Sequence, residues 1–397
     1  MTRSLSIFNY QLSIKSLIPL ALFILALALR VWQLDTIPPG WRDDELINSL
    51  VISQKTLDGD IALYYSDASG HEGLYHILNA AFLATFGAGA MGIRLLSAIL
   101  GALTVPLTYL LGRKLFDDWV GLTAAFALTF SFWSLMYSRI GLRHILMPVL
   151  VTAAFYFFWR GFRERETGDP AGRPYDYMLT AVFTGLSFYT YFASRGLPLI
   201  LLAFMGYVLL FDRERFKQEW RKWGMMLGLT AVIALPLFIT LSRQPESESR
   251  VAELAVPLVE ARAGNFAPLG EHIITTLSMF HATGDGEWLY NIPNRPVFGI
   301  IGALFFWTGV LIALYYTFKP LATRHSRPAH ESLASAFLLL WWLAGISPAF
   351  ISVPPASLGH TIMAQTAVYL IAALPIWAIG RWVNNRWVTL ALAALLV

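Results

Sequence analysis

Three consecutive acids, Asp43, Asp44 and Glu45, follow directly after the first long apolar run, in the stretch IPPGWRDDELINSL. The Pro-Pro-Gly sequence before them predicts a rigid turn. A run of acids is commonly a solvated helix N-terminus, where the helix dipole favours negative charge. Only 14% of this chain is charged, so acids at the end of an apolar run are also candidates for chemistry. A carboxylate at such a place can take a proton from a nucleophile.

The stretch SGHEGLYH, residues 69–76, brings His71, Glu72 and His76 close together in sequence. A zinc-protease helix needs histidines at i and i+4, so that both face one metal. Here they are five residues apart, which places them roughly 140° apart around a helix. This spacing argues against a metalloprotease, and an acid beside a histidine remains as a candidate wall of a site.

Arginines occur beside tyrosines in three further stretches, YSRIGLRHILMP, YTYFASRGLP and NIPNRP. Arginines at helix ends often extend their charged groups toward water, which is one interpretation. The other is a pocket for an anion, because the planar guanidinium matches phosphate. Carboxylates and arginines together fit group transfer from a phosphorylated lipid, in which arginine stabilises the leaving phosphate. The arginines are Arg139, Arg143, Arg195 and Arg295.

The elements that must position these residues are apolar helices. Hydrophobic residues make up 56% of the chain, and a bilayer-spanning helix needs about 20 mainly apolar residues. The apolar runs predict an all-α, polytopic membrane protein with about 10–11 transmembrane helices in one domain, 1–397. Two long segments connect them, 35–91 and 242–296. In the first, Trp41–Leu57 and Leu74–Phe86 predict helices lying at the membrane surface.

The distribution of Lys and Arg predicts the orientation. Most of them fall in the short loops that lie on the N-terminal side of the membrane, so the N-terminus is expected inside and both long segments outside. The first apolar run continues to Leu34 and predicts a retained signal anchor. The last, Trp387–Val397, is too short to span, so it is expected to lie in the interface or to continue beyond Val397.

Composition excludes several classes of function. Cysteine is absent, which rules out disulfides, thiol catalysis and cysteine metal sites. No glycine-rich phosphate loop occurs, so a soluble nucleotide donor has no site. The sequence pI of about 9.2 is explained by the basic inner loops, and no nucleic-acid partner is expected.

Five segments, in order along nearly the whole chain, resemble motifs of the GT-C membrane glycosyltransferases. The resemblance is to the protein O-mannosyltransferase and lipid A aminoarabinose transferase type, with Gly73 where a proline is usual. The segments are PPGWRDDEL, GHEGLYHIL, SRIGLRHILMPVL, YTYFASRGLPLILL and MFHATGDGEWLYNIPNRPVFG.

The resemblance implies an inverting glycosyltransferase of the cell membrane with its active site outside. The donor would be a polyprenyl-phosphate-linked sugar and the acceptor a protein, lipid or glycan, with membrane lipids around the enzyme. Asp44 would be the base and Glu45 its catalytic neighbour. The remaining implied site residues are His71, Glu72 and Tyr75 in the second motif, Arg139, Arg143 and Arg195 for phosphate, and His281, Asp285 and Arg295 in the last motif.

The resemblance requires no cofactor, although some of these enzymes use a divalent metal. Such a metal would take Asp44, Glu72 and His71. Two other functions are considered: a transporter or flippase of a lipid-linked sugar, and a non-catalytic membrane scaffold. A transporter needs ionisable residues or broken helices at mid-membrane, whereas charges here gather at span ends. The enzyme hypothesis requires Asp44 to share a cavity with Arg139 or Arg195.

Overall fold

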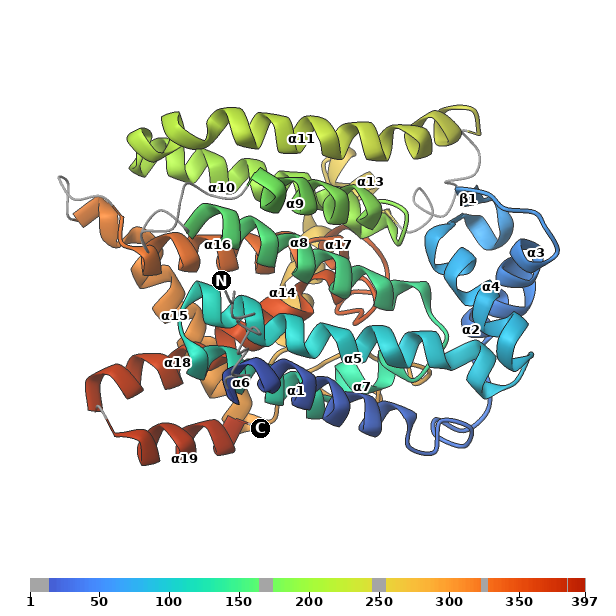
Figure 1. The fold of residues 1–397 in the computed structure, drawn as a ribbon, viewed down its shortest axis with the longest axis horizontal. Helices are drawn as coiled ribbons and strands as arrows, with labels where there is room; N and C mark the ends of the chain where they lie inside the picture. The colour runs from blue at the N-terminus through green and yellow to red at the C-terminus, as the bar shows by residue number, and fades with distance from the viewer. Residues whose placement is uncertain (1–13, 164–173, 245–254, 323–327, 384, 397) are drawn as a thin grey trace, which may run out of the picture.

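The computed structural model describes residues 14–163, 174–244, 255–322, 328–383 and 385–396. Long helices run side by side through most of the molecule (Figure 1). Within the described ranges the strands are two short ones, β1 (Tyr64–Tyr65) and β2 (His71–Glu72), which pair antiparallel. The prediction of an all-α membrane protein is confirmed.

Seven helical segments of the described residues are long and apolar enough to cross a membrane. A bent pair, α6 (Asp118–Phe130) and α7 (Phe132–Ser138), meets at 59° and makes an eighth if it is counted as one span. The seven are α5 (Ala90–Leu115), α8 (Leu146–Arg163, after the 3₁₀ turn η3, Arg143–Ile145), α10 (Leu197–Phe211, after η5, Phe192–Gly196), α11 (Arg213–Ser242), α15 (Ile300–Ala322), α16 (His330–Ile346, continued by α17, Pro348–Ile351) and α18 (Gln365–Val383, after η7, Ile362–Ala364).

Three shorter helices lie alongside these spans. They are α1 (Ile14–Val31), which packs on α5, α9 (Pro174–Ser187), which packs on α8 and α11, and α19 (Arg386–Leu396), which packs on α18. By length and composition, the described residues therefore hold seven to eight candidate spans, against the ten to eleven transmembrane helices expected. Helices dominate because a bilayer offers no water to satisfy backbone groups, so each segment must satisfy its own.

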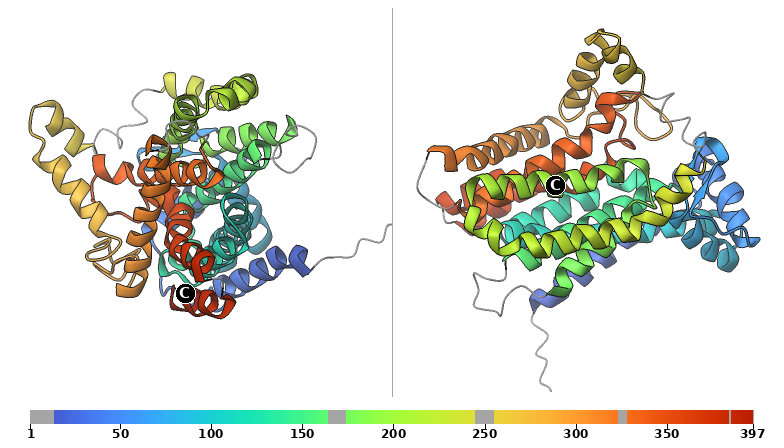
Figure 2. Two further views of the ribbon diagram at one scale, coloured as in Figure 1. Left: turned by 90° about the vertical axis from the view of Figure 1, so that its left-hand side faces the viewer. Right: turned by 90° about the horizontal axis from the view of Figure 1, so that it is seen from above.

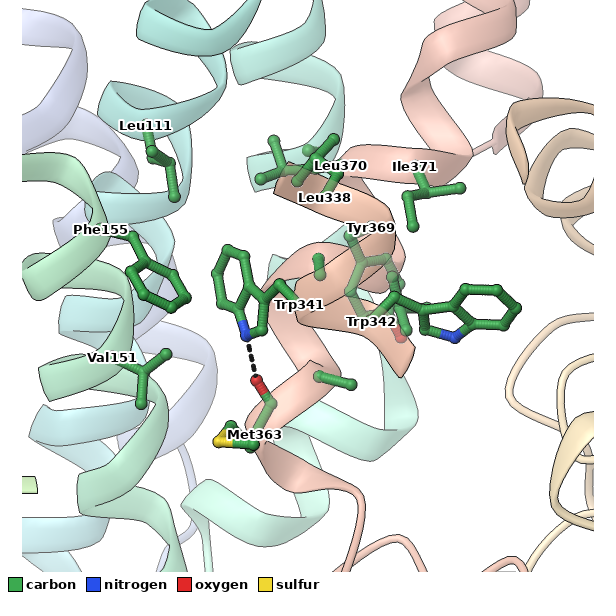
Figure 3. Close-up of a cluster of buried hydrophobic side chains, with 14 of the residues drawn as sticks. Leu111, Val151, Phe155, Leu338, Trp341, Trp342, Met363, Tyr369, Leu370 and Ile371 are labelled. Carbon is green, nitrogen blue, oxygen red and sulfur yellow. Dashed lines mark hydrogen bonds between the residues drawn. The ribbon is translucent and has the colours of Figure 1, made fainter. Parts of the chain in front are cut away.

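The most deeply buried spans are those of α18, α8, α5 and α16. In the apolar stretch of the α18 span 89% is buried, against 28% in that of α11, so α11 is peripheral. Figure 3 shows Trp341 of α16 beside Phe155 of α8, with its indole Nε1 donating to the Met363 carbonyl over 2.8 Å. A Cβ on Gly309 of α15 would lie 2.0 Å from the Ile371 oxygen, so glycine permits the close approach of α15 to α18.

The first long segment folds into short elements at one end of the bundle (right in Figure 1), whereas the α10–α11 and α18–α19 connections lie at the opposite end. The expected surface helices are present as helices: Trp41–Leu57 becomes a run with a wide π-helical turn in its middle. The second long segment supplies α13 and α14, which pack against α17 (Figure 2). The elements are α2 (Asp43–Leu46), η1 (Ile47–Ser53, π-helical), α3 (Gln54–Leu57), η2 (Asp67–Ser69), α4 (Leu74–Phe86), α13 (Val256–Arg262) and α14 (Ala267–Ser278).

A buried ion pair attaches α2 to the first turn of α5. Arg94 donates to the Glu45 carboxylate from Nη2 over 2.7 Å and from Nε over 3.0 Å, and both side chains are at most 1% exposed. The same carboxylate accepts from the backbone N–H groups of Arg42 and Gly141. The other Arg94 N–H groups donate to the carbonyls of Leu34, Pro38 and Gly40. This one pair therefore holds the whole turn before α2.

A second buried arginine closes the end of α1. The Arg139 guanidinium donates only to backbone carbonyls, which are those of Leu29, Arg30, Trp32, Gln33 and Ile37. The last carbonyls of a helix have no partner within the helix, so Arg139 satisfies them where the chain leaves α1.

We expect Glu45→Ala to lower the free energy of unfolding by about 3–5 kcal/mol, because it leaves the Arg94 charge buried and unpaired. The measurement is the melting temperature of the purified protein in detergent. The matched control is Glu214→Ala, which breaks the exposed pair of Glu214 with Lys217 and is expected to cost less than about 1 kcal/mol. Equal melting temperatures for the two variants would contradict the assignment.

Candidate functional site

A cavity of about 640 Å³ lies where the two long segments meet the ends of the spans. Its wall is drawn from α2, β2, η3, η5 and the loops before and after α17. The expected site residues that line it are Asp44, His71, Glu72, Arg143, Arg195 and Asp285. The expectation that Asp44 and Arg195 share a cavity is therefore met in the structure.

Five other expected residues lie outside this cavity. Glu45 and Arg139 hold the fold together, as described above. Tyr75 is fully buried in the core, with its hydroxyl 2.9 Å from that of Ser97. His281 is exposed and accepts from the Trp307 indole, and Arg295 is exposed over the ring of Phe132. Residue type and motif position alone did not separate these from the lining residues.

Two arginines from different spans meet at one glutamate. Arg143 lies in η3 before α8, and Arg195 in η5 before α10. Their guanidinium nitrogens lie 3.7 Å and 3.8 Å from the carboxylate oxygens of Glu72, which is 3% exposed. Two cations and one anion leave this group with one net positive charge, so it is suited to an additional anion such as phosphate.

The β1–β2 hairpin sets the direction of Glu72 and His71, which pair with Tyr64 and Tyr65. The next residue, Gly73, approaches the preceding loop closely: its N–H donates to the Leu63 carbonyl over 2.8 Å. A Cβ at Gly73 would lie 2.2 Å from the Ala62 oxygen. Proline, which the motif would place here, has neither an N–H nor the space. The departure from the motif therefore has a local structural cause.

Asp44 is held by a residue from the second long segment. The Tyr290 hydroxyl donates to Asp44 Oδ2 over 2.6 Å, and both residues line the cavity. The ring of Tyr290 packs against that of Tyr137, with centroids 5.9 Å apart. Burial raises the pKa of Tyr290, and the neighbouring Asp44 raises it further, so the phenol keeps its proton. Sequence reasoning missed Tyr290, although it lies in the last of the five motifs.

Asp285 ties the second segment to the loop before α18. It is 2% exposed, and its oxygens accept from the backbone N–H groups of Glu287 and Leu358, over 2.9 Å and 2.8 Å. Burial raises the pKa of the Asp285 carboxyl, although the hydrogen bonds from the two backbone N–H groups lower it. The carboxylate thus positions the chain that carries Tyr290.

Several polar lining residues were not expected from the sequence. Asn48 follows Asp44 by one helical turn, and its side-chain amide donates to the Asp44 carbonyl over 2.6 Å. His360 lies 2.9 Å from the Ser352 hydroxyl. A spacing of four residues after a candidate acid is the signal that would have identified Asn48. Further polar lining residues include His144, Tyr191 and Glu287.

The lining residues do not form a metal site. Across the described ranges, no group of three His, Asp or Glu side chains comes together in a way that could hold a metal ion. The set Asp44, Glu72 and His71 therefore does not fit one. His71 Nδ1 lies 3.0 Å from the Asp67 carbonyl instead, so this histidine helps to fix the hairpin that carries Glu72.

We expect Gly73→Ala to lower the melting temperature, because the added Cβ would collide with a backbone oxygen, which has little freedom to move. The control is Gly270→Ala in α14, where a Cβ meets nothing within 4 Å. Alanine favours helix over glycine by about 1 kcal/mol, so Gly270→Ala should be neutral or stabilising. A thermal melt of both variants in detergent measures the difference, and equal effects would refute the close contact at Gly73.

Known proteins share this architecture. A sequence model of the dolichyl-phosphate-mannose-protein mannosyltransferase family matches residues 74–239, and no curated protein matches. The oligosaccharyltransferase of Archaeoglobus fulgidus, solved with zinc and sulfate, is 18% identical at a TM-score of 0.58, over 96% of this chain and 52% of that one. ArnT of Cupriavidus metallidurans, solved with undecaprenyl phosphate, is 15% identical at a TM-score of 0.53, over 90% of this chain and 58% of that one.

The chain thus spans about half the length of the solved structures that it matches. Identities below 20% establish the architecture alone, and the family match begins after Glu72. The expected resemblance is confirmed at that level: the chain has the fold of the GT-C glycosyltransferases.

Proposed function

We propose that the chain is an inverting glycosyltransferase that moves a sugar from a polyprenyl-phosphate donor to an acceptor hydroxyl. The observation that carries this proposal is the shared cavity of Asp44, Arg143 and Arg195. One wall offers a carboxylate for the nucleophile, and the Glu72 group offers guanidiniums for a phosphate. Nucleophile activation and leaving-group stabilisation are the two requirements of such a transfer.

The cavity also suits an apolar carrier. Leu199 of α10, Leu258 of α13 and Ile351 of α17 line it, and Leu199 and Ile351 are exposed. A prenyl chain can pack against these side chains, which removes apolar surface from water. Two similar structures contain such carriers: ArnT with undecaprenyl phosphate, and the Archaeoglobus fulgidus enzyme AglB with an inhibitory peptide and a dolichol-phosphate.

The proposed reaction is a single displacement. The acceptor oxygen attacks the anomeric carbon as its proton passes to the Asp44 carboxylate. The bond from that carbon to the phosphate oxygen breaks, and polyprenyl phosphate leaves with its electron pair. Negative charge grows on the phosphate, so Arg143 and Arg195 accelerate the step to the extent that they bind this charge more tightly than the intact donor. Glu45 takes no part, because its oxygens are engaged by Arg94 and two backbone N–H groups.

The proposed active site faces the extracytoplasmic side. At the end opposite the first long segment (Figure 1), the start of α11 carries Arg213 and Arg215, and the last turn of α18 carries Arg381. Lys and Arg concentrate on the cytoplasmic side of membrane proteins, which supports an extracytoplasmic position for the other end, with α2 to α4.

We expect Asp44→Asn to reduce transfer by about 10²–10⁴-fold, since an amide cannot accept the nucleophile's proton. The donor is the glycolipid that co-purifies with the protein, identified by mass spectrometry, and the readout is release of polyprenyl phosphate. The control is Asp35→Asn, an exposed acid in the same segment and outside the cavity. Unchanged release in Asp44→Asn would remove the base assignment. Movement of the glycolipid across vesicles without release would favour a transporter.

We expect Arg143→Met and Arg195→Met each to weaken the binding of undecaprenyl phosphate by about tenfold or more, because each removes a charge-assisted hydrogen bond. Binding is followed by the quenching of tryptophan fluorescence in detergent. Arg295→Met is the matched control, since Arg295 is an exposed arginine of the same outer region that lies outside the cavity. An equal loss for all three variants would point to a general charge effect and against a phosphate site.

A further inference from the structure

The Asp44 side chain depends on a residue 246 positions away in the sequence. Asp44 belongs to the first turn of α2, is half-buried and lines the cavity. Its own helix does not orient the carboxylate: Asn48 donates to the Asp44 backbone carbonyl, and Asp43 accepts from the Asp44 N–H. Within the described part of the chain, the hydrogen bond that the Asp44 carboxylate accepts comes from Tyr290.

Tyr290 is held in place from several sides. Its N–H donates to the Glu287 carbonyl. Asp285 is fixed at the base of this loop by the N–H of Leu358, and the Asn291 amide donates to the carbonyls of Asp285 and Arg295. The Tyr137 ring packs against the Tyr290 ring. A phenol held in this way is a donor of defined position, and it reaches the carboxylate without having to be ordered at the moment of reaction.

We infer that Tyr290 is a positioning residue, which holds the Asp44 carboxylate in the direction needed for proton transfer. The inference rests on the proposed function. The phenol occupies Oδ2, so Oδ1 is the oxygen presented to the attacking hydroxyl. The transferred proton goes to the carboxylate, and Tyr290 keeps its own. The second long segment thereby takes part in the reaction, although it contributes no proposed base.

The test is Tyr290→Phe, which removes the hydroxyl and keeps the ring packing. With the co-purified glycolipid as donor, we expect kcat to fall about tenfold or more, the loss of one hydrogen bond to a charged group. KM for the glycolipid and the affinity for undecaprenyl phosphate should stay unchanged. Tyr75→Phe is the control: it removes a buried hydroxyl outside the cavity, so it should change stability and leave kcat as it is.

A second arm uses Asp44→Glu, which keeps a carboxylate but moves it by one methylene from the phenol. In the Asp44→Glu background, Tyr290→Phe should lower kcat by less than about twofold, because the two changes disturb the same contact. Independent losses that multiply would overturn the inference, as would a raised KM with unchanged kcat in Tyr290→Phe. Failure of the inference leaves transfer by the native protein intact. A native protein that releases no polyprenyl phosphate removes the proposed function, and the inference with it.

Discussion

The ion pair between Glu45 and Arg94 is the interaction on which the rest of the site depends. Burying two charges is costly unless every polar atom finds a partner, and here the carboxylate and guanidinium are surrounded by backbone donors and acceptors. Adjacent residues of a helix point about 100° apart. By anchoring Glu45 to α5, the pair turns Asp44 toward the cavity. Glu45, the acid next to Asp44 in the motif, therefore sets the direction of Asp44, while Asp44, the proposed base, lines the cavity.

The site is composite, with no single element that carries it. The two 3₁₀ turns η3 and η5 begin spans and present one arginine each, and the β1–β2 hairpin brings Glu72 between them. The second long segment supplies Tyr290 and Asp285. The spans provide a frame for the site, since their packing around α18 leaves the ends that carry the cavity in defined positions. Charges that are far apart in the sequence can then meet at distances that one flexible loop could not maintain.

Much of the architecture was predictable, because apolar runs of sufficient length have only helical solutions in a bilayer. The lining residues were harder to predict. Arg139 and Arg143 stand at i and i+4, which suggests one helix face, but α7 ends at Ser138 and the chain turns through Gly141. One arginine then faces the end of α1 and the other the cavity. Tyr290 was missed for a related reason, since nothing near it in sequence identifies Asp44 as its partner. Contacts of this kind are set by tertiary structure alone.

The wide turn η1 between α2 and α3 has a consequence for how this chain tolerates change. A π-helical turn bonds i to i+5, so it contains one residue more than the α-helix that it interrupts. Two side chains, Ser53 and His76, lie within hydrogen-bonding distance of the Asn48 carbonyl in this turn. Deleting one residue from Ile47–Ser53 would remove this extra residue and restore ordinary α-helical winding between α2 and α3. The Asn48 carbonyl would then no longer be spaced to face both Ser53 and His76, so the length of this turn helps to hold η1 against α4.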